Sequence, residues 1–403
     1  MPSFRAARTA LAALLALAAC GLLLPATSSA AKIRFGVHAQ NDLTAGEIER
    51  MGRGGVGVTR MIFRWSEIEP TAESPRNFRR YDAIMRTAAT EGVDILPIIV
   101  GVPGWARDSG AISPETGLEA WPLNPVGAAR LQLFIEAVVQ RYGHDGSFFV
   151  ENPTVPDRPL NAYQLWNEPN RQVFSPSGRS KAGDYAELLK ASALTIRQTD
   201  PRAKVVLAGM PERTTTSKPL DVYLKNLYKA PEVKKDFDIM TLHPYGVDEK
   251  GVEGAIKRLR SQLRRLGDKN RKLWISEVGW GSGGSPSPFR KKASEQARLL
   301  EKTFNRLEKR RKKYRLGTVI WFSWRDRLPP GKTGEWQEHT GLFEMEGEMK
   351  PAWTAFTAVS GGSPGKGDLR DGLGLPLRLD QNPAISELLP ELLPSPPTKD
   401  LAQ

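Results

Sequence analysis

Two glutamates stand where apolar segments end, and their surroundings suit acid–base chemistry. Glu168 follows the run 162–166, and Pro169 removes the backbone N–H that a continuing strand would need. Glu277 follows a second apolar run at 272–276. Cleavage of a glycosidic bond requires two opposed carboxyl groups, one to donate a proton and one to attack or to activate water. The two glutamates are therefore the candidate catalytic pair.

Short apolar runs alternate with longer amphipathic segments along the chain, which predicts a parallel α/β fold. Predicted strands are 33–38, 56–63, 94–100, 162–166, 204–208, 239–243, 272–276 and 318–323. Predicted helices are 44–53, 80–91, 125–142, 182–199, 220–228, 252–266, 291–311 and 351–359. Eight such pairs describe a (β/α)8 TIM barrel in one catalytic domain. An open doubly wound sheet would show the same alternation, and periodicity alone does not prove closure.

Strands four and seven of such a barrel would bring Glu168 and Glu277 face to face at the mouth, the end where the strands stop. A carboxylate nucleophile requires a separation of ~5–5.5 Å, and an activated water requires ~6.5–9.5 Å. We expect the shorter distance. We also expect the negative charge of Glu277 to raise the pKa of Glu168 and keep it protonated.

The two segments resemble the motifs of clan A glycoside hydrolases, with families 39 and 5 the most similar. The resemblance rests on the sequences WNEPN at 166–170 and ISEVGW at 275–280 and extends over about 33–359. It implies that Glu168, preceded by Asn167, is the acid/base and Glu277 the nucleophile. The implied activity is retaining hydrolysis of β-type O-glycosidic bonds in oligo- or polysaccharides through a covalent glycosyl-enzyme.

Further positions match the pattern of the clan one by one. Arg60 is similar to an arginine that hydrogen-bonds the nucleophile, although a surface role is the alternative. His243 and Tyr245 resemble a pair in which the tyrosine hydroxyl contacts the nucleophile and the histidine lines the site. The resemblance therefore implies that all three lie beside Glu277.

Aromatic side chains provide the expected sugar-binding surfaces. Trp324 is our choice for the strand-eight tryptophan that stacks under the sugar in this clan, with Trp321 in the core. Trp105 resembles a tryptophan that lines the cleft. His38 ends the first strand, where it could contact sugar hydroxyls or serve the core or a loop.

The chain divides into three predicted parts. Residues 1–31 have the pattern of a signal peptide, which predicts export. The alternative is a lipid anchor at Cys20, the single cysteine. Residues 32–360 form the predicted hydrolase domain. Residues 361–403 are rich in Pro, Gly and Leu and read as a disordered, dispensable tail.

The net charge of +13 restricts the possible partners. Basic clusters at 257–265 and 309–315 are interpreted as solvated helix faces, with attraction to an anionic glycan or wall polymer as the alternative. No nucleic-acid motif, metal-ligand cluster or cofactor-binding motif accompanies them, so we expect a cofactor-free monomer that acts on carbohydrate. A catalytically silent glycan-binding barrel and a basic protein that binds wall polymers are the alternative functions.

Overall fold

The computed structural model describes residues 32–39, 43–107, 121–171, 181–212, 217–367 and 369. The predicted signal peptide and residues 370–403 of the predicted tail lie outside this part of the chain. The described residues from Ile33 onward belong to one compact unit.

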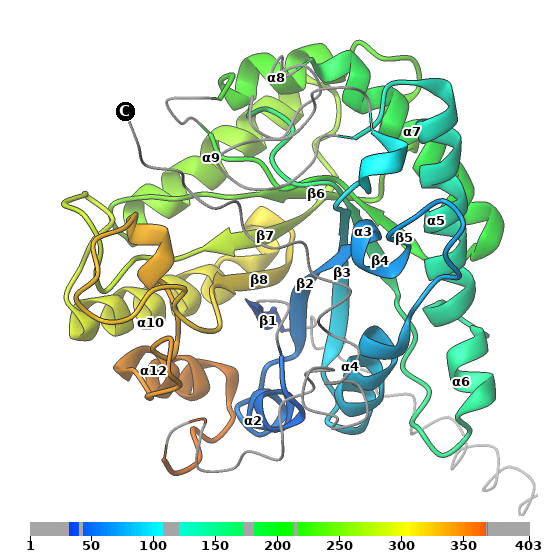
Figure 1. Ribbon diagram of the computed structural model, residues 1–403. Helices are drawn as coiled ribbons and strands as arrows, with labels where there is room; N and C mark the ends of the chain where they lie inside the picture. Colours follow the sequence, from blue (N-terminus) through cyan, green and yellow to red (C-terminus); the bar gives the residue numbers. More distant parts are fainter. Residues whose placement is uncertain are drawn as a thin grey trace, which may run out of the picture. The chain divides into compact units, whose positions relative to one another are not determined.

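The strands form one closed parallel barrel, in which each strand pairs with the next and β8 pairs with β1 (Figure 1). The predicted TIM barrel is confirmed, and the open sheet is excluded. Strand bounds are β1 (Arg34–His38), β2 (Val58–Arg64), β3 (Asp94–Val100), β4 (Ala162–Leu165), β5 (Lys204–Val206), β6 (Ile239–Leu242), β7 (Lys272–Val278) and β8 (Leu316–Phe322).

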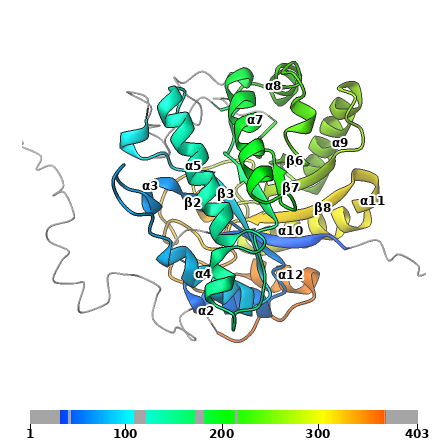
Figure 2. The same ribbon diagram turned by 90° about the vertical axis from the view of Figure 1, so that its right-hand side faces the viewer.

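Helices surround the barrel and cover its outer face (Figure 2). Their bounds are α2 (Ala45–Arg53), α3 (Trp65–Ile68), α4 (Arg79–Thr90), α5 (Pro125–Tyr142), α6 (Ser147–Glu151), α7 (Ala182–Thr199), α8 (Leu220–Leu227), α9 (Glu249–Arg265), α10 (Ala293–Lys309), α11 (Arg311–Tyr314) and α12 (Pro351–Ser360). Among the described helices, none combines the length and apolar character needed to cross a membrane. The short helices α3, α6 and α11 were not predicted, since single turns leave little periodic signal.

Local sequence signals fix where several helices begin. Thr44 caps α2 and forms a capping box with Glu47, so two backbone N–H groups at this end are satisfied. Asn124 accepts a hydrogen bond from a backbone N–H of α5, whose first residue is Pro125. Asp248 caps α9 in the same way. These ends agree with the predicted helices to within a few residues.

The barrel interior has an apolar floor and a polar layer above it. The floor is a cluster of buried side chains from six strands: Val58, Leu96, Ala162, Val206, Ile239 and Ile320. Because alternate residues of a strand face the same side, the next inward positions are Arg60 after Val58 and Gln164 after Ala162. The alternation therefore places polar groups at the mouth while the floor excludes water.

The segment after α12 corrects the predicted start of the disordered tail. The Arg50 guanidinium donates hydrogen bonds to the carbonyl oxygens of Pro364, Lys366 and Gly367 at 2.9–3.2 Å. The Trp353 indole N–H also donates to Pro364 at 2.8 Å. Backbone carbonyls carry no side-chain signature, so composition alone could not reveal this docking.

We expect truncation after Ser360 to lower the melting temperature by several degrees. It removes four hydrogen bonds made by Arg50 and Trp353, each worth about 1 kcal/mol. Truncation after Asp371 retains them and should leave the melting temperature unchanged. Thermal unfolding of both variants checks this, and equal melting temperatures would contradict the docking.

Candidate active site

Glu168 sits at the exit of β4 in an unusual backbone conformation. Trp166 and Glu168 have φ angles of 70° and 43°, in the left-handed region that side chains other than glycine rarely adopt. The Glu168 N–H donates to the carbonyl of Gly209 at 2.9 Å, and the Gln164 amide donates to the carbonyl of Trp166 at 3.1 Å. Such conformations persist only where surrounding contacts enforce them, and they cluster at functional sites.

Glu277 reaches the mouth because β7 contains an extra residue. Ile275 pairs with Val319, whereas Val278 pairs with Trp321, so three steps along β7 match two along β8. A bulge of this kind reverses the alternation of side chains after it. Glu277 therefore faces the polar layer instead of the surrounding helices.

Arg60 connects four polar side chains at the barrel mouth. Its guanidinium donates to the Glu277 carboxylate at 2.6 Å, to Asn167 at 2.7 Å and to Gln164 at 2.9 Å. The same nitrogen that donates to Glu277 also lies 3.2 Å from Nδ1 of His38. Arg60 is fully buried, so the geometry of this end of the barrel depends on it.

His243 and Tyr245 follow β6 and contact both glutamates. His243 Nδ1 lies 2.7 Å from Oε1 of Glu168 and 3.4 Å from Oε2 of Glu277. The Tyr245 hydroxyl donates to Glu277 at 2.7 Å. One carboxylate oxygen of Glu168 and one of Glu277 lie within 4.8 Å of each other and of His243.

These contacts determine the protonation of Glu277. Burial raises its pKa, but the charges of His243 and Arg60 outweigh burial, and the pKa falls below its ordinary value. The Tyr245 pKa is raised by burial and by the neighbouring carboxylates, so its hydroxyl keeps the proton that it donates. Glu277 is therefore an ionised carboxylate at neutral pH.

The pKa of Glu168 is lowered, whereas the sequence predicted that it would be raised. Burial does raise the pKa, but hydrogen bonds and charges from His243 and Arg171 outweigh it, so the pKa of Glu168 is lowered. Arg171 donates to Oε2 of Glu168 at 3.0 Å. The prediction considered the negative charge of Glu277 alone and had no means of placing Arg171 beside the carboxylate.

Gly209 leaves the space that His243 occupies. A Cβ atom at Gly209 would lie 2.0 Å from Nε2 of His243 and 2.4 Å from Oγ of Ser276. Any side chain there would push His243 away from Glu168. Gly209 lies just beyond β5, where the sequence alone would suggest an ordinary turn glycine. The need for glycine arises from His243, which is distant in the sequence.

His38 and Phe322 lie next to each other at the mouth. They are paired residues of β1 and β8, and their rings stack with centroids 5.1 Å apart. Burial, followed by the charge of Arg60, lowers the pKa of His38 to about 3, so its neutral Nδ1 accepts from Arg60. Phe322 is two residues after the inward-facing Ile320, and this alternation could have identified it as a mouth residue.

Trp324 does not lie at the barrel mouth, where the sequence predicted that it would stack under the sugar. It is fully buried, its indole N–H donates to Glu47 at 3.0 Å, and its ring packs against Phe343 and Trp353. The strand ends at Phe322, before Trp324, so the aromatic face nearest the mouth belongs to Phe322. Trp324 is therefore a core residue and presents no face to a sugar.

Trp105 is half-buried and held by structural contacts. Its indole N–H donates to the carbonyl of Glu69 at 3.2 Å, and its ring meets Trp65 edge-on. Trp321 is fully buried against Trp280, in the core as predicted. Among the described residues, no hydrogen bond joins Trp105 to the two glutamates, so its place in a cleft stays a prediction.

Glu168, His243 and Glu277 also have the donor atoms of a possible metal site, all within 4.8 Å. The positive charges of Arg60 and Arg171 already lie 2.6 Å and 3.0 Å from the two carboxylates. Two cations at this distance would repel a divalent ion. The arrangement therefore favours proton transfer and nucleophilic attack over metal binding.

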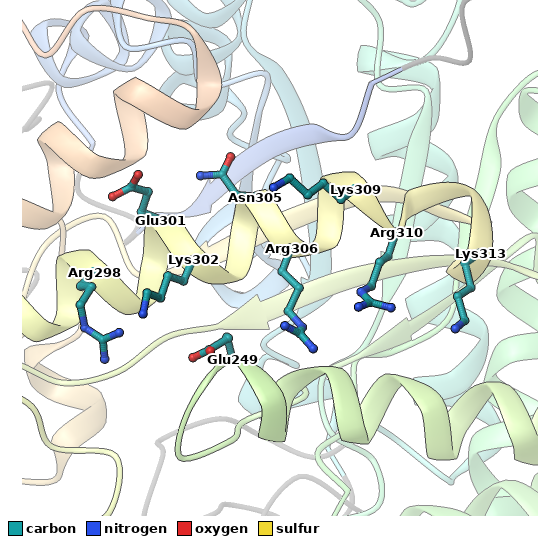
Figure 3. A pocket seen from close by; sticks show the side chains of 9 residues that line it. All are labelled: Glu249, Arg298, Glu301, Lys302, Asn305, Arg306, Lys309, Arg310 and Lys313. Carbon is teal, nitrogen blue, oxygen red and sulfur yellow. The ribbon is translucent and has the colours of Figure 1, made fainter.

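A separate cavity of about 740 Å³ lies outside the barrel, between α9 and α10 (Figure 3). Glu168 and Glu277 do not line it. Six of its lining side chains are basic, and Arg306 and Arg310 pair with the buried Glu253. Within the described residues, neither Lys302 nor Lys309 forms an ion pair or a side-chain hydrogen bond. The lining residues are Glu249, Arg298, Glu301, Lys302, Asn305, Arg306, Lys309, Arg310 and Lys313.

Comparison with known proteins identifies the fold but not a sequence family. No protein-family model matches the chain, and no curated protein matches it. Many solved structures do match, and they share the fold at low sequence identity. The similarity therefore establishes the architecture alone.

The matching structures include several glycosidases. The GH39 enzyme from Xanthomonas axonopodis pv. citri has a TM-score of 0.59 at 18% identity, covering 82% of this chain and 66% of its own. A monomeric beta-xylosidase from Caulobacter crescentus CB15 has a TM-score of 0.58 at 19% identity, with coverages of 81% and 67%. GH5_18 from Bifidobacterium longum has a TM-score of 0.57 at 14% identity, with coverages of 83% and 79%. The chain thus spans about two thirds of the length of the first two of these structures.

The Arg60–Glu277 pair should dominate the stability of the site. Arg60→Met leaves a buried carboxylate without its cation and should lower the free energy of unfolding by about 3–5 kcal/mol at neutral pH. Adding Glu277→Gln removes that charge and should recover part of the loss. Chemical denaturation measures both variants, and Arg298→Met, which breaks the exposed pair with Glu295, should have little effect.

The same pair predicts a pH dependence. Because the folded pKa of Glu277 is depressed, the pair stabilises the protein above the unfolded pKa of about 4.3, and this contribution is lost as pH falls through the folded pKa. The stability difference between the parent and Arg60→Met should therefore shrink on acidification. A difference that stays constant down to acid pH would contradict the assignment.

Proposed function

We propose that the protein is a retaining glycoside hydrolase acting on β-linked sugars, with Glu168 as acid/base and Glu277 as nucleophile. The observation that carries the proposal is the approach of the two carboxylates at the barrel mouth, with oxygen atoms within 4.8 Å. This approach is closer to the ~5–5.5 Å of a nucleophilic mechanism than to the ~6.5–9.5 Å that an activated water requires, and it supports the proposal in this way. The glycosidases of similar fold support the same class of reaction.

In the first step, a carboxylate oxygen of Glu277 attacks the anomeric carbon. The bond from that carbon to the leaving oxygen breaks, and Glu168 gives its proton to this oxygen. The hydrogen bonds from Arg60 and Tyr245 keep Glu277 ionised and orient it for attack. The product of this step is a glycosyl ester on Glu277 and a neutral leaving group.

In the second step, water attacks the same carbon and Glu168 accepts a proton from it. The ester bond breaks, and Glu277 returns as a carboxylate stabilised by Arg60. His243 contacts both glutamates and holds Glu168 in place through either step. Asn167, fixed by Arg60, and the rings of His38 and Phe322 are positioned to contact the sugar.

Removal of the nucleophile should stop turnover and be rescued chemically. We expect Glu277→Ala to lose activity on all β-glycosides, and azide to restore part of it with a glycosyl azide of inverted configuration, since the small anion fills the vacated space. Proton NMR of the product measures the configuration. Glu295→Ala, at an exposed position, is the control, and full activity of Glu277→Ala would overturn the nucleophile assignment.

Removal of the acid/base should depend on the leaving group. Glu168→Ala should cut kcat/KM by about 10²–10⁴-fold on substrates with poor leaving groups, because they need a proton. Formation of the glycosyl-enzyme from 4-nitrophenyl glycosides should survive, since this leaving group departs without one. Pre-steady-state kinetics separates the two steps. Equal losses on both substrate types would contradict an acid role for Glu168.

The basic cavity between α9 and α10 supports a second candidate function, attachment to an anionic glycan. Lys302, Lys309 and Lys313 are among its lining residues, and a second basic groove with no acidic lining shares Lys313. Charge of one sign in a groove attracts polyanions. Such attachment would hold a hydrolase near its polymer without altering the chemistry at the mouth.

A charge-matched pair of variants tests this attachment. Lys302→Glu with Lys309→Glu should abolish sedimentation with polygalacturonate at low salt, while Lys225→Glu with Lys229→Glu on and after α8 should retain it. Moderate salt should release the parent protein because the Debye length shortens. Equal binding by the two double variants would show that the groove is only a solvated helix face.

A further inference from the structure

Arg171 is an ion-pair partner of Glu168 that the resemblance to known hydrolases did not indicate. Its guanidinium donates to Oε2 of Glu168 at 3.0 Å, and its backbone N–H donates to the carbonyl of Glu168 at 2.8 Å. The Arg171 side chain is 24% exposed, whereas that of Glu168 is 8% exposed. Arg171 thus connects the buried carboxylate with the solvent side of the mouth.

Arg171 contacts one of the two candidate catalytic carboxylates. It contacts Glu168, which handles the leaving group, while Glu277 receives its hydrogen bonds from Arg60 and Tyr245. A group attached to the leaving oxygen would therefore approach Glu168 from the side where Arg171 lies. Arg171 therefore contacts the carboxylate that would act on the leaving oxygen, whereas Arg60 contacts the carboxylate that would attack the sugar.

This ion pair opposes the first chemical step. Glu168 must carry a proton when the glycosidic bond breaks, yet a cation at 3.0 Å favours the ionised carboxylate. His243 has the same effect from the other side of the carboxylate. Substrate binding must therefore weaken the hold of Arg171 on Glu168 before the acid can act.

The charge around the mouth indicates which kind of group could do so. Glu168 and Glu277 supply two negative charges, and Arg60 and Arg171 balance them. Arg327 adds a third cation close enough to act on His38. Among these charged groups, all within the described residues, three arginines face two carboxylates, which favours the approach of an additional anion.

We infer that the leaving-group sugar of the substrate carries a carboxylate, as in a uronic acid residue, and that this carboxylate pairs with Arg171. A planar guanidinium matches a carboxylate with two parallel hydrogen bonds, which favours this anion over a neutral hydroxyl. The inference rests on the proposed hydrolase function and specifies its substrate class. Arg171 is then the specificity-determining residue of the leaving-group side.

The pairing also couples substrate recognition to the acid. When the substrate carboxylate neutralises Arg171, Glu168 loses its stabilising cation and takes up one proton from solvent. That proton then passes to the leaving oxygen as the glycosidic bond breaks. A neutral leaving-group sugar would leave Arg171 on Glu168 and give slower cleavage.

Matched aryl glycosides test the inference. A panel of 4-nitrophenyl β-xyloside, β-glucoside, β-mannoside and β-galactoside first identifies the sugar that is turned over. The 4-carboxyphenyl and 4-carbamoylphenyl glycosides of that sugar are then compared, because their leaving groups have similar shape and acidity and differ in charge. We expect kcat/KM to favour the carboxylate by about tenfold.

Variants distinguish recognition by Arg171 from general attraction. Arg171→Gln should bring the two kcat/KM values to within about twofold of each other, whereas Arg202→Gln, at an exposed position after α7, should keep the parent preference. With the neutral substrate, Arg171→Gln should also move the alkaline limb of the kcat/KM profile to higher pH, since Glu168 then holds its proton more tightly. A role in folding alone would not move this limb.

The possible failures are distinct. If none of the four 4-nitrophenyl glycosides is hydrolysed, the proposed function itself is contradicted. If hydrolysis occurs with equal kcat/KM on the charged and neutral leaving groups, the function stands and the carboxylate inference is overturned. A carboxylate preference that persists in Arg171→Gln would also overturn it, because the discriminating cation would then lie elsewhere.

Discussion

The Arg60 guanidinium and the Glu277 carboxylate meet 2.6 Å apart inside the barrel, where water scarcely reaches either. Burying two charges costs free energy, and that cost is offset only when the remaining donors and acceptors are satisfied. Gln164 and Asn167 accept from Arg60, and Tyr245 donates to Glu277. One ion pair thus fixes side chains from β2, β4 and β7 and the loop after β6, and the position of each depends on the others.

Much of this arrangement follows from local sequence signals. Short apolar runs predict the strands, and the longer amphipathic segments between them predict the helices. Glu168 and Glu277 could be recognised because each ends such a run, and parallel strands bring their ends to one face. Arg60 and Tyr245 were found through resemblance, and the structure places both in contact with Glu277.

The remainder depends on contacts that no single segment encodes. The extra residue in β7 that turns Glu277 inward appears only when its pairing with β8 is known. The position of Trp324 was predicted wrongly because β8 ends two residues earlier, at Phe322. Phe322 is therefore the aromatic residue of β8 that faces the mouth. Arg171 follows the recognised motif directly, but its effect on Glu168 requires the distance between their side chains.

The closure of the barrel between β1 and β8 has a consequence for the order of folding. Arg60 and Glu277 are 217 positions apart in the sequence, and β1 cannot pair with β8 until almost the whole domain has been synthesised. Contacts of this range are slow to form because chain entropy must be lost first. The two glutamates therefore come together late in folding. Fragments that stop before β7 contain Glu168 but lack Glu277.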